Sequence, residues 1–151
     1  MTTIFDPPTR ERLISRVTTV RADNQARWGK MNACQMIEHC IRWNRWVLGM
    51  EEVIPYRQGL LGLLFGKSAL RSIVKDDAPL DRNLSTFGAL RVADANGDIR
   101  LKRDEWISLI ADFAHFDNPG FIHGFFGEMD REQIGILAYK HHDHHLRQFG
   151  L

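Results

Sequence analysis

The C-terminal segment joins a helical pattern of apolar residues to four histidines that lie within five positions, from 141 to 145. Asp130 and Gln133 have the spacing of a capping box, which marks the start of an α-helix. One helical face then carries apolar residues and two of the histidines: Ile134, Leu137, Ala138, His141, His145 and Phe149. A helix of this kind has to bury that face against other helices. The pattern therefore predicts an all-α bundle with histidines in its interior.

His141 and His145 are four residues apart, so their Cβ atoms lie about 6 Å apart on one face of the helix. Such a pair can bind one metal ion, but two histidines rarely complete a protein metal site. The other histidine on an apolar helical face is His39, which has Met36 and Trp43 on the same side. Three histidine ligands suit zinc, nickel, iron or manganese, whereas calcium and magnesium prefer oxygen ligands. The alternative is a polar helix face that holds no metal.

The remaining histidines favour other roles. His142 is about 100° around the helix from His141, and a solvated face is its expected position. His144 falls at the edge of the apolar face. His115 and His123 lie near predicted helix ends or in loops, where capping or hydrogen bonding is favoured over metal binding. The sequence does not assign an individual role to His142, His144 or His123.

Proline and glycine divide the rest of the chain into further helical segments. The spacing predicts helices over residues 7–21, from 32 up to the glycine at 49, over 60–74 and over 101–115. Asn32 and Gln35 repeat the capping-box spacing at the start of the second of these helices. Residues 51–95 are the least regular part and predict a long excursion that contains the third helix. Within it, Gly59–Gly66 is expected to roof the site or to line a dimer contact, and contact with a membrane surface, helped by Lys67 and Arg71, is the less favoured alternative.

Composition restricts the class of protein. The 151 residues are enough for a single domain over 1–151 that folds on its own core. The net charge of +1, without a long basic run, argues against nucleic-acid binding. Cys34 and Cys40 point to different faces of one predicted helix and cannot bridge each other. The longest apolar stretch is much shorter than the ~20 residues of a membrane span, and the N-terminal residues lack the apolar core of a signal peptide. We therefore expect a cytoplasmic protein without a membrane span.

Three other side chains near the predicted site have simpler interpretations than a role in chemistry. Adjacent helical residues diverge by about 100°, so Cys40 is expected to be a small buried residue and not a ligand beside His39. Glu38 points away from His39 for the same reason. Lys140 is expected on a solvated face. Apolar walls for the site are expected from Met36, Trp43, Leu137 and residues 60–65.

Two stretches of the sequence carry a resemblance to a known family. WGKMNACQMIEH ends at His39, and HGFFGEMDREQIGILAYKHHDHHLRQF runs from His123 to Phe149. Together with the middle stretch LLGLLFGKSALRSIVKDDAPL, they resemble the DinB/YfiT-like superfamily of metal-dependent four-helix bundles, in a branch known only as a domain of unknown function. The resemblance implies a four-helix bundle with an extra short helix and a long loop excursion. It also implies a metal triad of His39, His141 and His145.

Members of this superfamily include thiol-dependent transferases and isomerases. The resemblance therefore implies a divalent metal cofactor and an enzyme that conjugates a low-molecular-weight thiol to a small electrophile. A metal-dependent hydrolase and a non-catalytic metal- or ligand-binding bundle are the alternatives, because no general base is evident beside the triad. A homodimer is a further expectation. The sequence names neither the metal nor the substrate, and it assigns no catalytic residue.

Overall fold

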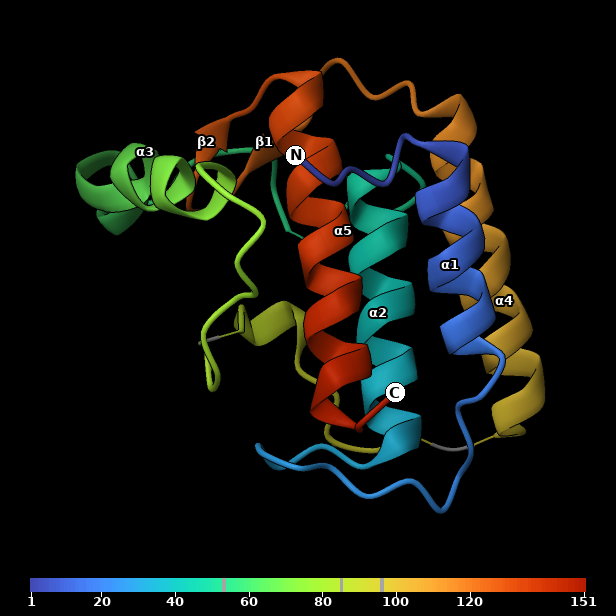
Figure 1. Cartoon of the computed structure of the whole chain (residues 1–151). Helices are drawn as coiled ribbons and strands as arrows, with labels where there is room; N and C mark the ends of the chain where they lie inside the picture. Colours follow the sequence, from blue (N-terminus) through green and yellow to red (C-terminus); the bar gives the residue numbers. More distant parts are fainter. Residues whose placement is uncertain (53, 85, 96) are drawn as a thin grey trace.

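The computed structural model describes residues 1–52, 54–84, 86–95 and 97–151. Within them the chain forms five α-helices: α1 (Pro7–Val17), α2 (Ala33–Val47), α3 (Leu60–Val74), α4 (Ile99–Asp112) and α5 (Arg131–Gln148). The smaller elements are the antiparallel strands β1 (Ile122–His123) and β2 (Gly127–Glu128) and the 3₁₀ turns Gly88–Leu90 and Phe113–His115. Helices α1, α2, α4 and α5 lie side by side as a four-helix bundle, and α3 projects from it (Figure 1). The expected all-α bundle is confirmed.

Both predicted capping boxes are present. The Asn32 side chain accepts a hydrogen bond from the amide nitrogen of Gln35, and the Gln35 side chain accepts one from the amide nitrogen of Asn32. Asp130 and Gln133 make the same pair of bonds at the start of α5. α2 ends ahead of Gly49, whose φ of +78° is favourable only for glycine. These signals fix where the two histidine-bearing helices begin and therefore which of their residues share a face.

Two other bundle helices differ from their predicted bounds. α1 ends at Val17 instead of residue 21, where the hydroxyls of Thr18 and Thr19 donate to main-chain carbonyls of the preceding turn. Such local hydrogen bonds compete with continuation of a helix. α4 begins at Ile99, ahead of the predicted start at residue 101, because the Asp98 side chain accepts a hydrogen bond from a first-turn amide. Both differences come from side chains that satisfy the backbone locally.

The bundle core is built around α2. Its residues Met36, Ile37, Cys40 and Trp46 have no solvent exposure. The other bundle helices complete this core with Leu13, Val17, Trp106, Ile110 and Leu146. Polar side chains that α2 directs into the bundle are therefore removed from water. No helix in the described part of the chain is long and apolar enough to cross a membrane.

α5 is buried on more than one side, and this corrects the prediction for Lys140. Residues 134–138 are five consecutive buried positions. Lys140 is only 4% exposed, and its ammonium group donates to the carbonyl oxygens of Ile73, Asp76 and Ala78 at 2.6–2.8 Å. A solvated position was the wrong expectation because three carbonyl acceptors inside the protein match the three N–H donors of a lysine. Lys140 thereby fastens the end of α3 to α5.

The extra helix α3 is present but not short, since it has 15 residues, as many as α2. Gly62 and Gly66 form its buried side, where a Cβ atom at either position would overlap the carbonyl oxygen of Phe125. The Gln58 side-chain amide donates to the same oxygen at 2.8 Å. α3 therefore attaches to the β1–β2 hairpin through a narrow glycine face. Residues 53 and 85 of the long excursion around α3 lie outside the described residues.

Candidate metal centre

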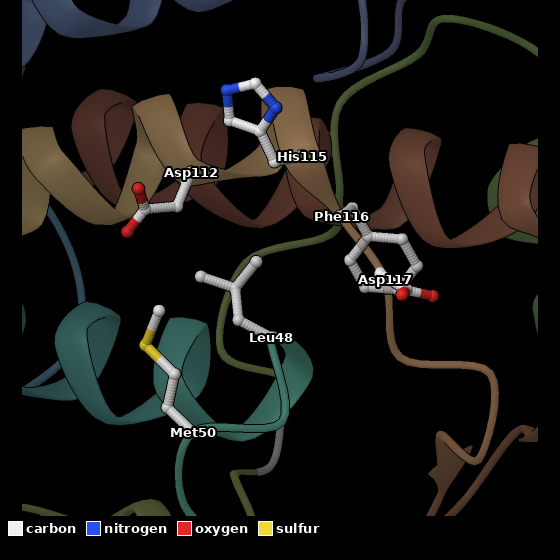
Figure 2. Close-up of a pocket in the computed structure, with 6 residues that line it drawn as sticks. All are labelled: Leu48, Met50, Asp112, His115, Phe116 and Asp117. Atoms are coloured by element: carbon white, nitrogen blue, oxygen red, sulfur yellow. The ribbon is translucent and has the colours of Figure 1, made fainter.

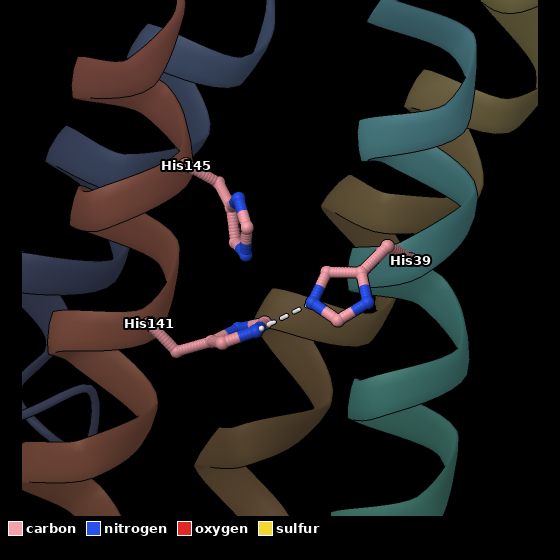
Figure 3. A group of neighbouring side chains, drawn as sticks. All are labelled: His39, His141 and His145. Carbon is pink, nitrogen blue, oxygen red and sulfur yellow. Dashed lines mark hydrogen bonds between the residues drawn. The ribbon is translucent and has the colours of Figure 1, made fainter. Parts of the chain in front are cut away.

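Three histidines meet between α2 and α5. Each of His39, His141 and His145 offers a ring nitrogen, and these nitrogens lie within 4.8 Å of one another. The Nε2 atoms of His39 and His141 are 3.1 Å apart, although the two residues are separated by 102 positions in the chain. Figure 3 shows His39 reaching from α2 toward the pair on α5. The structure therefore brings together the three histidines that the sequence singled out, while their role as metal ligands stays a prediction.

Two of the three imidazole rings are oriented by hydrogen bonds from Nδ1. His39 Nδ1 donates to the carbonyl oxygen of Leu90 at 3.0 Å, and His145 Nδ1 donates to Gln148 Oε1 at 3.0 Å. The amide of Gln148 is itself oriented, because its Nε2 donates to the Trp28 carbonyl oxygen at 2.9 Å. An acceptor at Nδ1 requires the ring proton there, which leaves the lone pair on Nε2. Both Nε2 lone pairs then point between the helices, where that of His39 accepts a hydrogen bond from His141 Nε2 at 3.1 Å.

Burial keeps the three imidazoles neutral. It lowers the pKa of His39 and lowers those of His141 and His145 well below the ordinary histidine range. For His141, the charges of the other two histidines lower the pKa further. Neutral imidazole is the form that binds metal ions, so these shifts favour metal binding at neutral pH.

Trp43 forms one wall of the histidine cluster, as expected. Its ring stacks on that of His141, with centroids 4.2 Å apart and an angle of 17° between the planes. The expected walls Met36 and Leu137 are also buried. The large apolar residues between positions 60 and 65 are not walls, because their side chains are 59–82% exposed. That expectation was wrong because α3 turns its glycines toward the protein and its leucines outward.

His142 is not on a solvated face. It has no solvent exposure, and its Nδ1 accepts a hydrogen bond from Trp106 Nε1 at 3.1 Å. Burial lowers the pKa of His142 to about 3. The prediction failed because it assumed that α5 has a single buried face. The run of apolar and small residues from 134 to 138 was the available signal that this helix is surrounded.

Cys40 occupies the buried position expected of it. Its thiol donates to Met36 Sδ at 3.9 Å, and burial raises the pKa of the thiol well above its ordinary value. Cys40 Sγ also lies within 4.8 Å of ring nitrogens of His141 and His142. This second group is a poor set of ligands, since the thiol stays protonated and the bond from Trp106 leaves the ring proton of His142 on Nε2. The three-histidine group is the better candidate for a metal.

The other candidate side chains have structural partners. Glu38 points away from His39 as predicted and pairs with Arg42 and Lys102. Burial alone would raise the pKa of Glu38, but the hydrogen bonds from Lys102 and Arg42 lower it overall. His123 makes hydrogen bonds of the kind favoured for it over metal binding, because its Nδ1 accepts the amide N–H groups that follow it in the hairpin, at 3.2 and 3.1 Å.

A pocket of about 260 Å³ lies beside the histidine cluster. It is lined by Trp28, Pro79, Leu80, Asp81, Arg82, His144 and Arg147. The Arg82 guanidinium lies over the Trp28 ring, 4.6 Å from its centroid, and the His144 ring meets the same indole edge-on. His144 also touches the ring of His145, with centroids 5.1 Å apart. This pocket therefore adjoins the candidate metal centre.

A second pocket, of about 270 Å³, lies elsewhere on the bundle. Figure 2 shows its lining, which is Leu48, Met50, Asp112, His115, Phe116 and Asp117. His115 is exposed and contributes to this pocket instead of the histidine cluster. None of the three clustered histidines lines it, so the second pocket is separate from the candidate metal centre.

The fold and the cluster together define a class of protein, a four-helix bundle with a histidine-rich potential metal site between facing helices. The model of the DinB superfamily matches residues 7–149, and the chain belongs to this superfamily. No curated protein and no solved structure matched the chain. The resemblance noted from the sequence is thereby confirmed at the level of the superfamily.

Proposed function

We propose that the chain binds one divalent transition metal through Nε2 of His39, His141 and His145. The observation that carries this proposal is the convergence within 4.8 Å of three neutral imidazoles, of which His39 and His145 are buried and His141 is partly buried. Two of them already donate Nδ1–H to fixed acceptors, which is the outer-shell arrangement of metal-binding histidines. Three nitrogen donors fit zinc, nickel, iron or manganese better than they fit calcium or magnesium.

The residues around the histidine cluster favour the binding of a small molecule. A divalent metal held there would supply Lewis acidity and lower the pKa of a thiol or water that it binds. Trp43 stacks on one face of the His141 ring. Arg82, Arg147 and Asp81 line the adjoining pocket, where the two cations outnumber the carboxylate and favour an anionic substrate. These features support the binding of a small ligand next to the histidine cluster.

Within this function, we favour conjugation of a low-molecular-weight thiol to a small electrophile. The carboxylates next to the histidines in sequence are engaged elsewhere: Glu38 with Lys102 and Asp143 with Arg16. Hydrolysis needs a base to accept a proton from water, whereas a thiol loses its proton far more readily. The same shortage of a free carboxylate supports a second candidate, a non-catalytic bundle that binds a metal or ligand.

Metal content measured by elemental analysis tests the binding site. We expect one metal ion per chain in the wild-type protein and almost none after His39→Ala, His141→Ala or His145→Ala. His115→Ala is the matched control, since His115 is an exposed histidine outside the cluster. Circular dichroism checks that each variant is folded. Full metal content in His145→Ala, with the helical signal unchanged, would contradict the proposal.

Turnover separates the enzyme from the binding protein. A panel of small thiols is incubated with apolar electrophiles in the presence of metal-loaded or chelated protein. We expect conjugation only with the loaded form, and loss of that activity in His39→Ala. Equal rates with loaded and chelated protein across the panel would favour the non-catalytic bundle.

A further inference from the structure

α3 carries most of the exposed large apolar side chains of this protein. Of nine such side chains in the described residues, five lie on this helix, and they are 59–82% exposed. They are Leu60, Leu61, Leu63, Leu64 and Phe65. Contiguous apolar patches of this kind mark surfaces that bind another partner. Neither the core nor either of the two pockets described above uses these five residues.

α3 is attached to the protein through a narrow strip of its surface, and the rest of the helix circumference is uncovered. Gly62 and Gly66 seat the helix on the Phe125 carbonyl oxygen, and Leu70 is buried on the same side. At 100° per residue, these three positions span only about 80° of the helix circumference. The helix projects from the bundle, as Figure 1 shows. The apolar side chains of its first two turns therefore face away from the rest of the chain.

The exposed side of α3 is also positively charged. Residues 57–75 contain Arg57, Lys67, Arg71 and Lys75 and no acidic residue, and all four cations are exposed. Lys67 donates to the main-chain oxygen of Glu128, and Lys75 lies 3.9 Å from the carboxylate of Asp76. Counted at 100° per residue, Lys67, Arg71 and Lys75 fall within about 40° of the mean direction of Leu60 and Leu64. One ridge of the helix therefore begins with leucines and continues with cations.

We propose that α3 docks on the surface of an anionic phospholipid bilayer. Binding of a helix to a membrane surface grows with the apolar area that it buries and with the attraction of its cations to anionic lipids, and the ridge of α3 offers both. The leucine end of the ridge would enter the layer below the headgroups, and Arg71, one helical turn or more further along, would meet the headgroup phosphates. A second copy of the chain fits less well, because it would bring the same cations to a helix that has no acidic residue to pair with them.

Vesicle sedimentation tests the proposal. We expect the wild-type protein to bind vesicles of phosphatidylcholine with phosphatidylglycerol, to bind pure phosphatidylcholine at least about tenfold more weakly, and to be released by salt. Leu60→Gln with Leu64→Gln should weaken binding by at least about tenfold, since both side chains enter the interface. Arg71→Gln should weaken it about fivefold. Leu101→Gln is the matched control, because Leu101 is 70% exposed on α4, and its binding should equal that of the wild type.

Three outcomes would overturn the proposal. The first is a lack of wild-type binding to the anionic vesicles. The second is undiminished binding by both the leucine and the arginine variants. The third is a wild-type protein that is a dimer in light scattering and becomes a monomer in the double leucine variant. That result would make α3 a contact between two copies of the chain. All of the substituted side chains are exposed, so circular dichroism should remain unchanged in every variant.

Discussion

Gln148 offers a sharp test of the candidate metal centre because it touches a proposed ligand without being one. It is 4% exposed, accepts Nδ1–H of His145 and donates to the Trp28 carbonyl oxygen. Gln148→Leu keeps the approximate volume but removes the acceptor. A metal on Nε2 requires the proton of His145 on Nδ1, where this variant leaves it buried without a partner. The metal-free ring can instead carry its proton on Nε2, so the penalty falls mainly on the metal-bound state.

The size of that penalty follows from the cost of an unsatisfied buried donor, about 1–3 kcal/mol. At 1.4 kcal/mol per factor of ten, metal affinity should fall by about fivefold to about 150-fold. Gln148→Glu keeps an acceptor for His145 and should lose less affinity than Gln148→Leu. The matched control is Arg147→Leu, an exposed position in the same turn. It should retain wild-type affinity.

Competition with a chromophoric chelator measures the affinity, and thermal unfolding of the metal-free proteins checks the fold. The expected order of affinity is wild type, then Gln148→Glu, then Gln148→Leu. A folded Gln148→Leu protein that binds metal within twofold of the wild type would refute the argument that Gln148 orients His145. An equal loss in Arg147→Leu would show that the effect belongs to the helix end and not to the hydrogen bond.

Three further predictions concern stability. Burial lowers the pKa of His123 to about 3, against about 6.5 in an unfolded chain. Only the unfolded state therefore takes up this proton as the pH falls from about 6.5 to about 3, so stability is lost across that window. Between pH 7.5 and 5, denaturant titration should show about 2 kcal/mol more loss in the wild type than in His123→Asn, which keeps an acceptor oxygen. The same slope in both proteins would contradict this. Lys140→Met removes three bonds from an ammonium group to carbonyls and should lower the free energy of unfolding by about 2–4 kcal/mol, as measured with urea. A change below about 0.5 kcal/mol would mean that the desolvation of the lysine cancels those bonds. Gly66→Ala should destabilise by about 1–3 kcal/mol despite the better helix propensity of alanine, because its Cβ would overlap the Phe125 carbonyl oxygen. Gly120→Ala, where a Cβ would meet nothing within 4 Å, is the control and should stay close to wild type in thermal unfolding.

Periodicity and capping were sufficient to predict the helices that carry the site. The two capping boxes set the phase of α2 and α5, and that phase predicted that His39, His141 and His145 would face one another. The superfamily was also recognisable from the motifs that contain them. Capping boxes and helical periodicity can be recognised in a sequence because each depends only on residues within one or two helical turns.

The remaining features depend on how distant segments pack. A helical wheel assigns one buried face to a helix, so it could not show that α5 is surrounded and that Lys140 and His142 are buried. Gln148 gave no signal because its partners, His145 and the Trp28 carbonyl, meet only in the folded chain. The apolar run on α3 predicts either a wall of the site or a dimer contact, and the exposure of its side chains contradicts only the wall. Hydrophobicity alone does not distinguish a core from an exposed patch.

The hydrogen bond from His39 to position 90 has a consequence for mutational tolerance. The acceptor is the main-chain oxygen of Leu90, at 3.0 Å, at the end of the 3₁₀ turn Gly88–Leu90. Every amino acid supplies that oxygen, so this support for His39 is insensitive to which side chain occupies the position. It is sensitive to the path of the backbone. In a deep mutational scan, deletions and insertions between the end of α3 and this turn should reduce metal binding far more than apolar substitutions at position 90, where the side chain itself has only to remain buried.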